Sequence, residues 1–222
     1  MAHIELKQNE VSEPLGDGYY IIQPVDGYRF GSDAVALKNF AGRFIKKSDR
    51  VCDLCSGCGV VGLLLAIEKG ATVVGAEIDD ALLDMSNRSA TANGLNNAVF
   101  YHADIKNLSE LLEKIGKKSC DAVVCNPPFF KSDSKASKLA PNANSELTVN
   151  FDQIADAAKA LLKSGGGFYI VHTATRLDEI LSKCRSRGLT PKNLIVNNNG
   201  KTFLLRCVYG GRDGLTVDVE NF

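Results

Sequence analysis

The sequence has no tryptophan, only three histidines, and no apolar run long enough to cross a bilayer, which takes about 18 or more consecutive apolar residues. Its first residues also lack the charged, apolar and small-residue segments of an export signal. These absences argue against a membrane-spanning helix and against secretion. We therefore expect a cytoplasmic protein with no membrane partner.

The formal net charge is zero, because 26 Lys and Arg residues balance 26 Asp and Glu residues. This balance excludes a strongly basic nucleic-acid-binding domain. Any contact with RNA would have to come from local lysine clusters, which are also typical of ordinary solvated surfaces. The clusters are Lys46-Lys47, Lys117-Lys118, and the group of Lys131, Lys135 and Lys138.

The seven cysteines are an odd number, which argues against a framework of disulfides. Cys52, Cys55 and Cys58 have the spacing of iron–sulfur ligands, but Cys52 lies in a strand pattern and no fourth cysteine with a following proline is near. The other four lie in apolar segments, where a free thiol behaves as a small hydrophobic group. The histidines show no metal-ligand spacing either, so we expect no metal site.

Strand-like and helix-like segments alternate along most of the chain. Runs such as 72–76 and 120–125 have the length and apolar character of buried strands, whereas 60–69 and 80–93 carry apolar residues at helical spacing. This alternation predicts an α/β fold with a doubly wound, mostly parallel sheet, which binds ligands at the carboxyl ends of its strands.

Turn signals near both ends of the chain predict two hairpins. Asp17-Gly18 precedes the strand-like run Tyr19–Gln23, and Asn197–Gly200 separates the strand-like runs 194–196 and 202–208. The first hairpin would precede the alternating region, and the second would end it.

The first strand of the alternating region carries an acid, Asp53, close to its carboxyl end and just ahead of a glycine-rich turn. The turn runs from Ser56 to Gly62, with Gly57, Gly59 and Gly62 in the G-x-G-x-x-G spacing. Glycines at such a strand-to-helix turn let backbone amides approach a ligand that a Cβ atom would keep away. The spacing alone is weak evidence for a nucleotide site.

Acids at the next two strand ends, Glu77 and Asp104, strengthen that evidence. A carboxylate at a strand end can accept hydrogen bonds from two sugar hydroxyls. The sequence therefore predicts a pocket built across several strand ends and lined by carboxylates.

With these residues the stretch resembles the class I S-adenosylmethionine-dependent methyltransferases. The resemblance implies S-adenosyl-L-methionine as the cofactor, and a Rossmann-like, seven-stranded, mostly parallel sheet with a C-terminal antiparallel hairpin. It also implies that Asp53 faces the methionine ammonium, that Glu77 holds the ribose, and that Asp104 and Ile105 border the adenine. Ser56, Gly57, Gly59 and Ile78 complete this part of the implied cofactor set. We expect a single domain over 1–222, with a small hairpin-and-helix extension at 1–47 and a catalytic core at 48–222.

The run 120–125 leads directly into Asn126-Pro127-Pro128-Phe129, which looks like the N-P-P-(F/Y) signature of methyltransferases that act on conjugated amino groups. Prolines cannot continue a strand ladder, so Asn126 is expected at the carboxyl edge of its strand. The Asn126 side-chain oxygen and the Pro127 carbonyl would accept both N–H groups of the amine and turn its lone pair toward the methyl group. Phe129 would offer a stacking face for a base. The segment that follows, 130–150, is expected to be a long loop beside the site.

The run Tyr28–Leu37 adds a second resemblance, to the bacterial enzymes that methylate adenine 37 of valine tRNA on its exocyclic amine. It implies that Phe30, Ser32 and Asp33 close over the methionine end of the cofactor, beside Asn126, and that tRNA or another structured RNA is the partner. The chain departs from that pattern at 144–146, where Asn-Ser-Glu stands in place of an Arg-His-Glu-like run.

We therefore expect an N-methyltransferase that acts on an adenine amine in RNA, at position 37 of a tRNA. A guanine 2-amine or a protein glutamine amide stays open as the acceptor, because both are conjugated NH2 groups. A nicotinamide-dependent oxidoreductase uses the same glycine spacing but leaves the Asn126 motif unexplained. A non-catalytic RNA-binding protein that keeps the fold is the remaining alternative.

Overall fold

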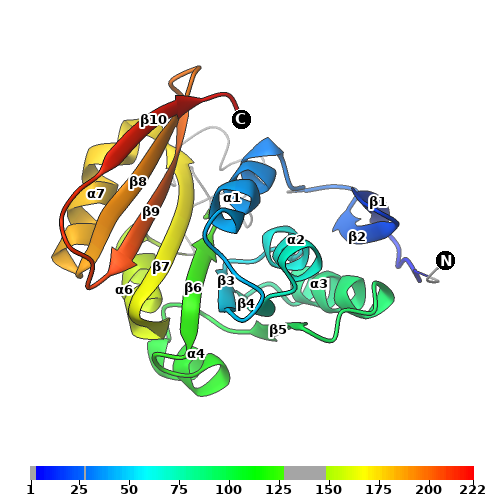
Figure 1. Ribbon diagram of the computed structural model, residues 1–222. Coiled ribbons are helices and arrows are strands. Elements are labelled where there is room, and N and C mark those ends of the chain that lie inside the picture. Colours follow the sequence, from blue (N-terminus) through cyan, green and yellow to red (C-terminus); the bar gives the residue numbers. More distant parts are fainter. Residues whose placement is uncertain (1–3, 28, 128–148) are drawn as a thin grey trace.

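The computed structural model describes residues 4–27, 29–127 and 149–222, and a mixed sheet runs through its centre (Figure 1). The strands of this sheet are β3 (Arg50–Leu54), β4 (Thr72–Glu77), β5 (Ala98–His102), β6 (Cys120–Cys125), β7 (Leu162–Thr173), β8 (Leu189–Asn197), β9 (Thr202–Tyr209) and β10 (Thr216–Glu220). Their order across the sheet is β10-β8-β9-β7-β6-β3-β4-β5. The chain enters at β3, builds toward β5 on one side, and then returns to build from β6 on the other. The junction of β3 and β6 is thus the switch point where open α/β sheets bind ligands.

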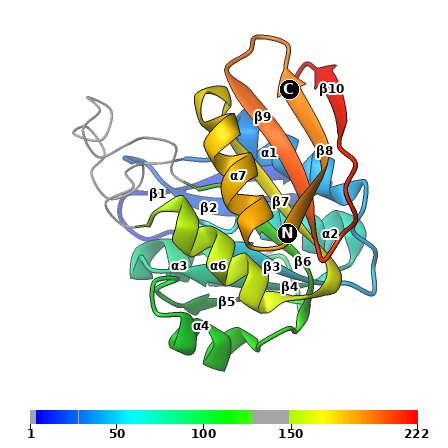
Figure 2. The same cartoon turned by 90° about the vertical axis from the view of Figure 1, so that its left-hand side faces the viewer.

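Helices cover both faces of the sheet, as Figures 1 and 2 show from two sides. One face carries α1 (Ser32–Gly42), α2 (Val60–Lys69) and α3 (Asp80–Ala92), and the other carries α4 (Leu108–Ile115), α6 (Phe151–Leu161) and α7 (Leu177–Ser186), which follows a short 3-10 turn at Ala174–Arg176. Each face buries its own hydrophobic cluster, and successive side chains along a strand point alternately into the two clusters. On β6, for example, Val124 packs under α1–α3 and Val123 packs under α4, α6 and α7. The predicted doubly wound α/β fold is confirmed.

Glycines set both ends of α2, which is why its bounds agree with the range expected from the sequence. The helix begins after Gly59, which has a φ of 82°, and ends at Gly70, which has a φ of 65°. Residues other than glycine rarely adopt this left-handed conformation, so these two positions mark the boundaries of the helix in the sequence itself.

The expected count of seven strands is wrong, because the sheet has eight. β8 and β9 form the predicted antiparallel hairpin, and β10 then adds to the outer edge in parallel with β8. The β10 side chains are largely exposed, including Val217 and Val219. Backbone pairing at a sheet edge, rather than burial, holds this strand, and such pairing leaves little trace in a hydrophobic pattern.

The predicted N-terminal hairpin is present as β1 (Glu10–Gly16) and β2 (Tyr19–Pro24), which pair antiparallel. It is anchored on α3 by side chains that satisfy its backbone. The Ile22 N–H donates to Ser89 Oγ at 2.9 Å, and the Tyr20 N–H donates to Asn93 Oδ1 at 3.0 Å. The hairpin therefore stands on the same side of the sheet as α1, α2 and α3.

All seven cysteines are free thiols. Within the described ranges, no three His, Cys, Asp or Glu side chains come together as a set of metal ligands. None of the described helices is long and apolar enough to cross a bilayer.

Candidate active site

Three of the predicted site residues meet at the carboxyl ends of adjacent strands, because β4, β3 and β6 are neighbours. Asp53 pairs laterally with Gly75 on β4 and with Val124 on β6. Glu77 is two residues beyond Gly75, and Asn126 is two residues beyond Val124. Side chains two residues apart in a strand point to the same face, so Asp53 and Glu77 both point to the α1–α3 side, on strands about 4.8 Å apart. Asn126 directly follows the end of β6.

Two glycines of the loop after β3 are needed for different reasons. Gly57 and Gly59 both have a left-handed backbone, with φ values of 55° and 82°. A Cβ atom on Gly59 would lie 2.8 Å from the Phe100 ring, so packing excludes a side chain there. A Cβ atom on Gly57 would meet no atom within 4 Å. Space beside the Gly57 Cα atom is therefore free of protein atoms, and a ligand could approach the backbone there.

Asp53 is 1% exposed, and the backbone of the next helix contacts its carboxyl group. Its Oδ2 accepts the Gly62 N–H at 2.9 Å. Burial raises the pKa of Asp53 to about 8, the Gly62 hydrogen bond opposes that rise, and the nearby Glu77 charge adds to it. At neutral pH the carboxyl is mostly protonated, and a cation beside it would restore the charged form.

Glu77 is held rigidly by three backbone amides. Its Oε2 accepts the Gly57 N–H at 2.7 Å, and its Oε1 accepts the N–H groups of Ile78 at 2.9 Å and Asp79 at 3.0 Å. Burial raises the pKa of Glu77, and these hydrogen bonds lower it in part. A carboxylate has about four acceptor positions, so one remains, on Oε2. In this conformation Glu77 can take one ribose hydroxyl, and taking two would require giving up the Gly57 contact.

The residues at these strand ends fit S-adenosyl-L-methionine. Ser56 is 8% exposed, and its hydroxyl has no hydrogen-bond partner in the part of the chain that the structure describes. Gly57, where a Cβ atom would meet no neighbour, is the next residue. A ligand with an ammonium group suits a site that contains the buried Asp53 carboxyl, because a nearby cation favours its charged form.

The start of α1 lies at the same end of the sheet as these residues. α1 and α2 both run toward the strand starts, so their first turns, including Ser32 and Asp33, lie toward the carboxyl ends. Burial raises the pKa of Asp33. Phe30 packs against the cluster under α1–α3, and its N–H donates to the Gln23 side chain at 2.9 Å.

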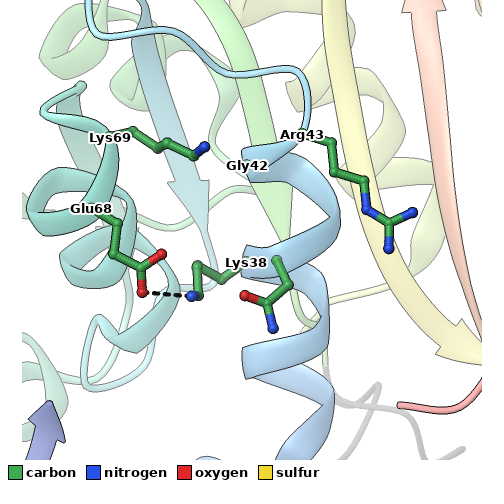
Figure 3. Close-up of a pocket in the computed structure, with 6 residues that line it drawn as sticks. Lys38, Gly42, Arg43, Glu68 and Lys69 are labelled. Carbon is green, nitrogen blue, oxygen red and sulfur yellow. Dashed lines mark hydrogen bonds and ion pairs between the residues drawn. The ribbon is translucent and has the colours of Figure 1, made fainter.

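The opposite ends of these two helices form a separate pocket of about 170 Å³ (Figure 3). It is lined by Lys38, Asn39, Gly42, Arg43, Glu68 and Lys69. The Lys38 Nζ atom donates to Glu68 Oε1 at 2.6 Å. Helix C-termini carry partial negative charge, which Lys69 in the last turn of α2 balances. The pocket contains none of the predicted site residues.

Asp104 and Ile105 follow β5, one strand beyond Glu77. The Asp104 Oδ1 atom accepts the Lys106 N–H at 2.9 Å. Ile105 is buried in the cluster under α4, α6 and α7, which lies on the other side of the sheet from Asp53. The structure thus places Asp104 at the edge of the site and packs the Ile105 side chain into the core.

The Asn126 motif is described only in part. Asn126 is half-buried and Pro127 is buried. Pro128, Phe129 and the expected loop, up to residue 148, lie outside the described residues.

Sequence analysis missed two residues near the site, Gln23 and Cys55. Gln23 is fully buried and bonded to Phe30, yet in sequence it is only the polar end of a strand-like run. Cys55 has a φ of 56°, in the region that favours glycine, and its thiol lies near that of Cys125. Neither feature has a local sequence signal, because both depend on contacts with distant residues.

Comparisons with known proteins agree with this geometry. The family model for the methyltransferase small domain matches residues 30–186. A tRNA1(Val) (adenine(37)-N6)-methyltransferase from Porphyromonas gingivalis is 31% identical over 157 residues, which cover 68% of this chain and 61% of that protein. A ribosomal protein uL3 glutamine methyltransferase from Bradyrhizobium diazoefficiens is 30% identical over 105 residues, which cover 47% of this chain and 31% of that protein.

The fold is shared with solved structures. The crystal structure of P. horikoshii TYW2 in complex with MeSAdo matches with a TM-score of 0.67 and 13% identity, over 92% of this chain and 73% of that one. The family model covers well over half of the chain, and it includes the glycine loop, the three acids at strand ends and the Asn126 motif. On these grounds, the chain belongs to the methyltransferase small domain family.

Proposed function

We propose that this protein transfers a methyl group from S-adenosyl-L-methionine to the exocyclic amine of an adenine in RNA, at position 37 of a tRNA. The observation that carries the proposal is the register of β4, β3 and β6. It brings the end of β6, which leads into Asn126 and Pro127, beside the strands that carry Asp53 and Glu77. An amine acceptor and a cationic methyl donor would meet there.

The cofactor supplies an electrophilic methyl group on a sulfonium. The chain's own residues would hold it: Asp53 would provide the counter-charge for the methionine ammonium, and Glu77 would accept a ribose hydroxyl. Ser56 would contribute a hydroxyl, and the lack of a side chain at Gly57 would leave room for the ligand. Phe30, Ser32 and Asp33 close the methionine end, and Ile78, which is 43% exposed, offers an apolar surface beside Glu77.

The acceptor is positioned rather than deprotonated in advance. A conjugated NH2 group is a weak nucleophile because its lone pair is delocalised into the ring. The Asn126 side-chain oxygen and the Pro127 carbonyl oxygen accept its two N–H bonds and turn the lone pair toward the methyl group. The amine becomes acidic once its lone pair forms the new bond, so no dedicated base is needed.

Two arguments favour an RNA adenine as the methyl acceptor. One is the name of a relative of the chain, and the other is the low cost of moving an unpaired base into a pocket. The Porphyromonas relative is named for adenine 37 of a tRNA, and its match covers 68% of this chain. A base in an anticodon loop is already unpaired, so moving it into a pocket costs little.

The test is mass spectrometry of tRNA nucleosides from cells with and without this protein. We expect N6-methyladenosine to disappear from one tRNA when the protein is absent. Purified protein should then restore the mark on tRNA from the deficient cells, in the presence of tritiated methyl donor. An unchanged nucleoside profile together with no transfer to that tRNA would refute the adenine proposal.

The role of Asn126 is tested separately with Asn126→Ala. We expect the cofactor dissociation constant to stay within about twofold, while methyl transfer falls by roughly 100-fold or more, because the acceptor loses its alignment. Asn198→Ala, at an exposed turn after β8, is the matched control and should change neither quantity. Full turnover by Asn126→Ala would end the proposed mechanism.

A protein glutamine amide is the second candidate acceptor. It is also a conjugated NH2 group, and the Bradyrhizobium relative is named for glutamine methylation. Ribosomal proteins offered in the same tritium assay separate the two acceptors. Label in protein and none in tRNA would favour the amide.

A further inference from the structure

Gln23 is a fully buried polar residue at the end of the N-terminal hairpin. Its side-chain oxygen accepts the Phe30 N–H at 2.9 Å, and its side-chain nitrogen donates to Glu13 Oε2 at 2.6 Å. Both ends of the amide are thus engaged, one within the hairpin and one in the segment that leads into α1. The side chain forms a bridge between these two parts of the chain.

Glu13 strengthens this bridge through a second contact. It lies on β1 opposite Ile21, and its other carboxylate oxygen forms an ion pair with Arg29. The hairpin therefore holds two consecutive residues of the segment before α1, Arg29 by charge and the Phe30 backbone through Gln23. We call Glu13, Gln23 and the Phe30 N–H the relay.

The relay is separate from the contacts that dock the hairpin on α3. Docking uses the hydrogen bond from Ile22 to Ser89, the pair formed by Tyr20 with Asn93, and the ion pair of Arg88 with Glu10. None of these involves Gln23. A buried amide is costly unless both of its ends are bonded, so an apolar residue would serve the hairpin core as well. An apolar residue at position 23 could not accept the Phe30 N–H, so Phe30 would no longer be held in a fixed position.

We propose that Gln23 is a positioning residue for the cofactor, acting through Phe30. By fixing the Phe30 backbone, the relay sets the first turn of α1, with Ser32 and Asp33, over the methionine end of the ligand. The inference rests on the proposed placement of the cofactor at this turn. It is independent of which substrate is methylated.

The first test compares Gln23→Met with Ser89→Ala. Methionine has a similar length and removes both relay hydrogen bonds, whereas Ser89→Ala removes a docking bond and leaves the relay intact. The dissociation constant of S-adenosylhomocysteine is measured by calorimetry, and the thermal unfolding of each variant is measured without ligand. We expect binding to weaken roughly tenfold in Gln23→Met and less than about twofold in Ser89→Ala, although both unfold at lower temperature. Equal binding by Gln23→Met and the unmodified protein, or equal losses in both variants, would overturn the proposal.

The second test reverses the polarity of the relay, which separates positioning from a general loss of packing. Gln23→Glu places a second carboxylate against Glu13 and should weaken binding. Adding Glu13→Gln returns a donor at position 13 and an acceptor at position 23, so the double variant should recover most of the lost affinity. A double variant that binds no better than Gln23→Glu alone would refute the relay.

Phe30→Ala distinguishes the two ways in which the proposal can fail. If Phe30→Ala and the Gln23 variants all bind the cofactor normally, the placement of the cofactor at this turn is wrong. If Phe30→Ala weakens binding and Gln23→Met does not, the placement stands and the relay is refuted.

Discussion

Replacing Asp53 by asparagine should stabilise the protein in the absence of cofactor and weaken its binding of the cofactor. Burial raises the pKa of Asp53 from 3.8 to about 8. Between these values the folded state keeps a proton that the unfolded state releases. Rising pH therefore favours unfolding, and the stability of the free protein should fall from about pH 4 to pH 8 and then level off.

The size of the effect follows from the same shift. The free energy of unfolding falls over about 3.2 pH units, from pH 3.8 to pH 7. At about 1.36 kcal/mol per unit, the loss of stability at pH 7 is about 4 kcal/mol. Asp53→Asn removes this term and keeps a carbonyl oxygen for the Gly62 N–H. We therefore expect the variant to gain up to about 4 kcal/mol at pH 7 relative to the unmodified protein, and almost nothing at pH 4.

The assay is urea unfolding at pH 4, 5, 6, 7 and 8 without cofactor, followed by calorimetric titration with cofactor. Asp213→Asn is the control, because its carboxylate is 89% exposed and should leave the pH profile unchanged. The cofactor should bind more weakly to Asp53→Asn, because the ammonium loses its counter-charge. Parallel pH profiles for the Asp53 variant and the unmodified protein would refute the reasoning, and unchanged cofactor affinity would refute the role of Asp53.

Three further substitutions test the loop and the strand end. Gly57→Ala should cost about 1 kcal/mol from its left-handed backbone alone, whereas Gly59→Ala should cost about 1–3 kcal/mol more because its Cβ atom meets the Phe100 ring. Thermal unfolding measures which of the two variants is less stable. Equal losses of stability in both variants would contradict the packing argument. Glu77→Gln turns an NH2 group toward at least one backbone N–H, so it should lower stability by about 1–3 kcal/mol and weaken cofactor binding. Urea unfolding and calorimetry measure the two effects, and an unchanged cofactor affinity would remove Glu77 from the site.

Features set by local patterns were predictable. The helix Val60–Lys69 and the strand Cys120–Cys125 agree with the expected ranges, because glycines bound the first and a short apolar run defines the second. β10 was not predictable in this way. It buries little side-chain surface and is held by backbone pairing with β8, which no periodicity records.

The sequence by itself determined the order of the elements and the chemistry at their ends: an acid and a glycine turn after one strand, an acid closing the next, and Asn126 closing a third. These are local properties, set by side-chain period and by the φ values that only glycine and a few other residues adopt readily.

Only the tertiary structure decided that β4, β3 and β6 are neighbours, that Asp53 and Glu77 share one face of the sheet, and that the strand leading into Asn126 lies next to Asp53. It also decided the raised pKa of Asp53 and the burial of Gln23 against Phe30. The physical reason is common to all of them. Strand pairing, desolvation and buried hydrogen bonds arise between residues far apart in the chain, so their strength depends on the packing that brings those residues together.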